Sequence, residues 1–128
     1  MSVLPRTDVL VLACPLTPQT EQLIDAAALA ALPTDAIVIN VGRGRLIDTE
    51  ALVAALQANQ LHGVALDVTD PEPLPTEHVL WALPQVVITP HVAGHTPRYF
   101  DRCAEILLDN IDALPASGVP SGLRNQVV

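Results

Sequence analysis

The chain has 128 residues, half of them hydrophobic, and a formal net charge of −8 at pH 7. This length fits one domain, and an acidic chain without a clustered basic face is unsuited to binding nucleic acid. All six basic residues are arginine, which excludes a lysine-dependent phosphate-binding loop and a Schiff-base lysine. No apolar run is long enough for a membrane span, and Cys14 and Cys103 lack a CxxC spacing. We therefore expect a soluble, cytoplasmic protein that contacts no membrane.

Short apolar runs rich in β-branched residues predict four buried strands, at residues 8–13, 36–41, 62–68 and 85–89. Helices are predicted between the first three strands, at residues 26–32 and 48–58. Asp25 and Asp48 are suited to cap the amino ends of these two helices. Alternating strands and helices favour an α/β fold, one half of a doubly wound, Rossmann-like parallel sheet with its strands in sequential order. An all-helical alternative is difficult to reconcile with 12 prolines.

Loops and one long helix complete the predicted elements. Residues 69–84 are proline-rich and predict an ordered loop, and residues 90–96 predict a second loop. A helix is expected from Pro97 to about Ala113, with Thr96 as its cap and proline at its first position. Its apolar residues fall on one helical face: Phe100, Cys103, Ile106, Leu107, Ile111 and Leu114.

A glycine turn, Gly42-Arg43-Gly44, follows the second predicted strand. In parallel sheets ligands bind at the carboxyl ends of the strands, and glycines let a backbone approach closely. The turn begins like a GxGxxG dinucleotide fingerprint, but Ile47 replaces the third glycine, so the fingerprint fails. The alternative interpretation is a tight turn that carries a solvated arginine.

Four polar residues follow the ends of three neighbouring predicted strands: Arg43, Asp67, Glu72 and His91. If the sheet is parallel, they converge at one edge. An arginine can hold a carboxylate with two hydrogen bonds, and a histidine beside a glutamate is suited to acid/base chemistry near neutral pH. The alternative is that each is a solvated loop residue.

His91 and His95 are four residues apart, a spacing that on a helix would suggest zinc. Pro90, Gly94 and Pro97 oppose a helix there, and the sequence offers no third ligand. We therefore expect no metal site.

Taken together, these segments resemble the NAD-binding domain of the D-isomer-specific 2-hydroxyacid dehydrogenases. The similarity covers almost the whole chain, and the order and spacing of the motifs are specific. The matching segments are residues 8–11, 15–20, 39–44, 63–68, 71–73 and 89–94.

The resemblance implies hydride transfer between NAD or NADP and a 2-hydroxy or 2-keto acid such as glyoxylate or hydroxypyruvate. By matching position, Arg43 binds the substrate carboxylate, Glu72 and His91 form the acid/base pair, and Asp67 contacts the nicotinamide carboxamide. The residues implied to bind the cofactor are Cys14, Pro15, Val41, Gly42, Arg43, Asp67, His91 and Gly94. Formate dehydrogenases of the same superfamily carry glutamine where this chain has Glu72, so they match less well.

The chain also departs from the family pattern. Ala13 stands where a histidine is frequent, although small residues occur there too. The GxGxxG segment and the separate substrate-binding domain precede the matching region in the family. We therefore expect residues 1–128 to be the carboxyl-terminal part of an NAD(P)-binding domain that lacks its GxGxxG half and its substrate domain.

Two other functions stay open from the sequence. Corepressors of transcription resemble the same family, so the chain could be a nucleotide-sensing regulatory module; it could also be an inactive truncated remnant. An in-frame GxGxxG encoded upstream of Met1 would favour the enzyme. We expect a homodimer for the enzyme. The isolated chain is expected to be inactive and to self-associate through the open edge of the strand at residues 8–13 or through the long helix.

Overall fold

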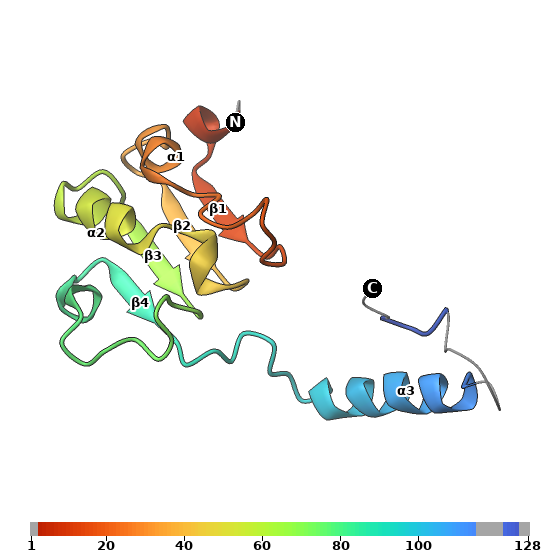
Figure 1. Cartoon of the computed structure of the whole chain (residues 1–128). Helices are drawn as coiled ribbons and strands as arrows, with labels where there is room; N and C mark the ends of the chain where they lie inside the picture. The colour runs from red at the N-terminus through yellow and green to blue at the C-terminus, as the bar shows by residue number, and fades with distance from the viewer. Residues whose placement is uncertain (1–2, 115–121, 126–128) are drawn as a thin grey trace. The chain divides into compact units, whose positions relative to one another are not determined.

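The computed structural model describes residues 3–114 and 122–125, and the chain forms two units, Met1–Ala93 and Gly94–Val128. The first unit contains a four-stranded parallel sheet in the order β1-β2-β3-β4 (Figure 1). The strands are β1 (Val9–Leu12), β2 (Ile37–Asn40), β3 (Gly63–Leu66) and β4 (Val86–Ile88). The prediction of a half sheet with four parallel strands in sequential order is confirmed, although each strand is shorter than predicted.

Two helices connect the first three strands: α1 (Ala26–Ala30) and α2 (Thr49–Gln57). Both predicted caps are confirmed, since Asp25 accepts the amide of Ala28 at 2.8 Å and Asp48 accepts that of Ala51 at 3.0 Å. The sequential strand order and right-handed crossovers place α1 and α2 on the same face of the sheet, where they contact each other (Figure 1).

The hydrophobic core lies between these helices and the sheet. It includes Leu12, Val38, Val64 and Leu66, which alternate along their strands with residues on the opposite face. On that opposite face Val9, Val11 and Val87 remain 50%, 54% and 60% exposed. The sequence predicted buried strands; in the structure only one face of the sheet is buried, because both connecting helices cover the same face.

Residues 69–84 form the ordered loop that was predicted. Leu74 and Leu80 anchor it in the core, with 8% and 2% of their surface exposed. A short 3-10 helix, η3 (Val79–Ala82), was not predicted. The peptide bonds Asp70–Pro71 and Glu72–Pro73 are cis. Anchoring by two leucines explains how a segment with little regular structure can present side chains in defined positions.

The second unit contains α3 (Tyr99–Asp112), of which no residue is buried. The prediction that Thr96 caps this helix and Pro97 is its first residue was wrong. The cap position is Arg98, and the Thr96 carbonyl accepts the Tyr99 amide at 2.9 Å in a turn that precedes the helix. In the described residues, no helix combines the length and hydrophobicity that crossing a membrane would require.

Candidate active site

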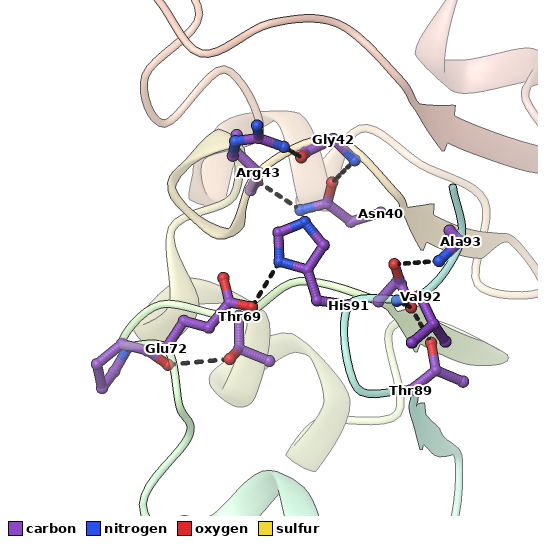
Figure 2. A network of polar contacts seen from close by, with 11 residues as sticks. Asn40, Gly42, Arg43, Thr69, Glu72, Thr89, His91, Val92 and Ala93 are labelled. Carbon is purple, nitrogen blue, oxygen red and sulfur yellow. Dashed lines mark hydrogen bonds and ion pairs between the residues drawn. The ribbon is translucent and has the colours of Figure 1, made fainter. Parts of the chain in front are cut away.

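The turn that carries Arg43 is held by a buried amide at the end of β2. Asn40, only 1% exposed, donates from Nδ2 to the carbonyl of Arg43 at 2.8 Å and accepts the amide of Gly42 at 3.0 Å (Figure 2). The Arg43 side chain is solvent-exposed, and its Nη1 donates to the Gly42 carbonyl at 2.7 Å. The fold thus fixes the backbone of the turn and leaves the guanidinium accessible.

Asp67 follows β3 and is 6% exposed. Its Oδ1 accepts the Thr89 hydroxyl and the amide of Val92 at 2.9 Å, and its Oδ2 accepts the amide of Ala93 at 2.8 Å. Burial opposes ionisation, but the hydrogen bonds and the nearby His91 outweigh it and lower the pKa of Asp67 below its usual 3.8. One buried carboxylate therefore holds the segment on both sides of His91.

His91 points toward Glu72 and toward the turn of Arg43 (Figure 2). Its Nδ1 lies 2.8 Å from Oε1 of Glu72, with both side chains about half exposed. An ionised carboxylate only accepts hydrogen bonds, so Nδ1 carries a proton and Nε2 is the nitrogen that remains for proton exchange. The backbone φ of His91 is +56°, in the left-handed region, which costs about 1 kcal/mol for a residue other than glycine.

Two hollows lie at the carboxyl edge of the sheet. The first, about 260 Å³, has Asp67, Glu72 and His91 on its wall together with the apolar Leu74, Trp81 and Ile88. The second, about 650 Å³, is lined by residues after β1 and β2: Ala13, Cys14, Pro15, Leu16, Val41, Gly42 and Arg43.

The structure groups the predicted residues as follows. Glu72 and His91 are in contact, and Asp67 lies beside them. All the predicted cofactor residues of the β1 and β2 loops line the second hollow with Arg43. Arg43 does not line the first hollow, and Gly94 belongs to the second unit.

Sequence reasoning missed Asn40 and Thr89, which hold the two loops from the ends of β2 and β4. A signal was present, because Asn40 is the polar last residue of β2 and Thr89 is the polar residue directly after β4. Residues 90–98 are not helical, as Pro90, Gly94 and Pro97 predicted, so His91 and His95 do not share a helix face. Across residues 3–114 and 122–125, no group of three histidine, cysteine or acidic residues is arranged to hold a metal ion.

Comparisons with known proteins agree with this geometry. The sequence model of the family described as "D-isomer specific 2-hydroxyacid dehydrogenase, NAD binding domain" matches residues 1–93. Glyoxylate/hydroxypyruvate reductase B of Citrobacter koseri is 44% identical over 116 residues, which cover 88% of this chain and 35% of that protein.

Two solved structures are also similar. A D-lactate dehydrogenase from a Sporolactobacillus species has a TM-score of 0.84 and 39% identity, covering 99% of this chain and 42% of its own. A D-isomer specific 2-hydroxyacid dehydrogenase from Xanthobacter autotrophicus Py2, in complex with NADPH and MES, has a TM-score of 0.78 and 38% identity, covering 88% of this chain and 47% of its own. The chain thus spans less than half the length of each of these relatives.

Proposed function

The chain belongs to the D-isomer specific 2-hydroxyacid dehydrogenase family, and from this membership we propose that the protein transfers a hydride between NAD(P)(H) and a 2-hydroxy or 2-keto acid. Glyoxylate and hydroxypyruvate are the proposed substrates, because a similar relative is named as a reductase of both. The observation that carries the proposal is the pair of Glu72 and His91 at 2.8 Å, at the same sheet edge as an exposed arginine.

Each residue has a proposed role that follows from its chemistry. His91 gives a proton from Nε2 to the substrate carbonyl oxygen in reduction and takes it back from the hydroxyl in oxidation. Glu72 orients the ring through Nδ1 and stabilises the imidazolium by its charge. Arg43 binds the substrate carboxylate with two hydrogen bonds and stabilises negative charge on the neighbouring oxygen.

The size and position of the second hollow support its proposed use for the nicotinamide part of the cofactor. About 650 Å³ at the ends of β1 and β2 is within the range of small-molecule sites, and parallel sheets bind such ligands at this edge. Cys14, Pro15, Val41 and Gly42 would line the nicotinamide side, and the bound cofactor would supply or accept the hydride at substrate C2. Asp67 would use its remaining acceptor capacity for the carboxamide, since a carboxylate can accept about four hydrogen bonds.

The test is an assay of glyoxylate and hydroxypyruvate reduction with the protein as encoded by its gene. The reaction is monitored through the absorbance of NADH or NADPH. His91→Ala is expected to lower kcat at least about 100-fold, because the proton donor is lost. His62→Ala is the matched control, since His62 is an exposed histidine at the start of β3 and lines neither hollow.

Unchanged turnover in His91→Ala would remove the acid/base assignment. Tight NADH binding without reduction of any 2-keto acid would favour the nucleotide-sensing alternative instead. We also propose a cytoplasmic homodimer for the active protein; sedimentation of the purified protein tests the dimer.

A further inference from the structure

Gly44, the residue after Arg43, lies against the backbone of another loop. A Cβ atom built on Gly44 would be 2.0 Å from the carbonyl oxygen of Thr69, 2.1 Å from its carbonyl carbon and 2.7 Å from the amide nitrogen of Asp70. These are backbone atoms, which cannot rotate away as a flexible side chain can. Any side chain at position 44 must therefore push the two backbones apart. The glycine thus allows the close backbone approach that the sequence predicted, here with the chain's own Thr69–Asp70 backbone.

The two backbones leave little space between them on their buried side. The hollow around this contact, bounded also by Asn40, Leu52 and Leu66, measures only about 10 Å³, at the lower limit for one water molecule. On one side of the contact, Asn40 donates a hydrogen bond to the Arg43 carbonyl. On the other, the hydroxyl of Thr49, the first residue of α2, donates to the Asp70 carbonyl at 2.9 Å.

The contact joins the two halves of the candidate active site. Gly44 is bonded directly to Arg43, and Asp70 is two residues before Glu72, whose carboxylate contacts His91. Between Asp70 and Glu72 stands only Pro71, which has no backbone freedom in φ. A displacement of Thr69 and Asp70 is thus transmitted to Glu72.

We propose that Gly44 is a positioning residue: by letting the Arg43 turn lie directly on the Thr69–Asp70 backbone, it fixes the spacing between the substrate-binding guanidinium and the Glu72–His91 pair. This inference rests on the proposed function. The reacting carbon lies between the carboxylate and the oxygen that exchanges the proton, so both groups must be placed together.

The first test is structural and needs no turnover. In long-range ¹H–¹⁵N spectra of the protein as encoded by its gene, the Nδ1 signal of His91 reports its hydrogen bond to Glu72. Gly44→Ala is expected to change this signal and the amide signals of Arg43, Thr69 and Asp70, with most core amides unchanged. Gly63→Ala is the matched control, because its added Cβ would meet a single backbone atom, the Gln85 carbonyl oxygen at 3.3 Å, which needs a shift of only a few tenths of an ångström.

The second test measures kinetics of the protein as encoded by its gene. Gly44→Ala is expected to raise KM for glyoxylate, through Arg43, and to lower kcat, through Glu72 and His91. The fall in kcat/KM should be about 100-fold, as for a misplacement of about 1 Å. A Gly44→Ala protein with kinetics within twofold of wild type, or with an unchanged His91 signal, would overturn the inference.

If Gly44→Ala does not fold, Thr49→Val decides the question. It removes the hydroxyl that holds Asp70 without adding volume to the contact, and a loss of about fivefold in kcat is expected from one lost hydrogen bond. An unchanged His91 signal and unchanged kcat in Thr49→Val would then contradict the inference. A wild-type protein without any reductase activity would refute the proposed function, whereas the spectra would still decide whether Gly44 sets the Glu72–His91 contact.

Discussion

Asp67 is the buried charge that organises the candidate site. It binds groups on both sides of His91, a residue whose backbone is left-handed and would relax without such support. The chemistry proposed for His91 therefore depends on a side chain that hydrogen-bonds the neighbouring residues rather than the imidazole itself.

The first prediction concerns Asp67→Asn. The amide nitrogen of asparagine cannot accept the amide proton of Val92 or Ala93, so one buried donor loses its partner. At pH 7 we expect the free energy of unfolding, measured by urea denaturation, to fall by about 2 kcal/mol. Asp35→Asn, at an exposed position, is the control.

The pH dependence of this loss has a definite sign. The pKa of Asp67 is lower in the folded state than its usual 3.8, so its carboxylate stabilises the fold above that pH. This contribution is lost as the pH falls through the folded-state pKa. The difference between wild type and Asp67→Asn should be constant from pH 7 to 5 and should shrink below about pH 4. A difference that is the same at pH 3 would contradict the assignment.

The sequence predicted the side chains with a recognisable chemistry but not those that support them. Arg43, Asp67, Glu72 and His91 each follow a strand whose apolar pattern is clear. The contact of Gly44 with Thr69 joins positions 25 residues apart and has no local pattern. Asn40 was likewise missed, because its role depends on the shape of the turn after it.

Helix α2 begins shortly after the Gly44 turn, and its first residue, Thr49, binds the Asp70 carbonyl, so its amino end bears on the site. Asp48 caps this end, and Thr49 follows with its bond to Asp70. An acidic side chain here also interacts favourably with the helix dipole. Local order at this terminus thus contributes both to stability and to the position of the Glu72 loop.

The second prediction tests the cap. Asp48→Ala leaves the Ala51 amide without its side-chain acceptor and is expected to lower the free energy of unfolding by about 1 kcal/mol. Asp35→Ala removes an exposed carboxylate outside any helix and should change the free energy of unfolding little. Equal losses in the two variants, measured by urea denaturation, would show that general charge and not capping is responsible.

Elements with strong local signals were predicted well. The strands and the capped helices α1 and α2 follow from apolar runs and from aspartates at helix starts. The predicted start of α3 was wrong, because both Thr96 and Arg98 can precede a helix. The turn that contains them is set by a backbone hydrogen bond, which the sequence does not show. The exposed strand face was missed because sequence shows apolar character but not on which face the connecting helices pack.

Among the described residues of the first unit, the sheet ends at β1, which pairs only with β2. Its other edge carries backbone groups that no neighbouring strand pairs, and natural proteins protect such edges. Val11 on this strand is 54% exposed. This open edge supports the expectation that the isolated chain self-associates.

The third prediction follows from this edge. The isolated chain should scatter light at tens of micromolar as a species heavier than 13.6 kDa, and Val11→Lys should restore the monomer, because an edge lysine opposes strand pairing. Leu107→Lys, on the exposed face of α3, distinguishes association through the helix. A monodisperse wild-type monomer would contradict self-association altogether.

The one-sided burial of the sheet also determines how stability responds to temperature. The change in heat capacity on unfolding follows the apolar surface that becomes newly hydrated. Val9, Val11 and Val87 are already about half hydrated in the folded monomer, so they add less to it than fully buried valines would. The heat capacity change on unfolding of the monomer should therefore lie below the usual value of about 12 to 15 cal/mol/K per residue. A small heat capacity change flattens the curve of unfolding free energy against temperature, so cooling weakens this fold less than it weakens a domain packed on both faces.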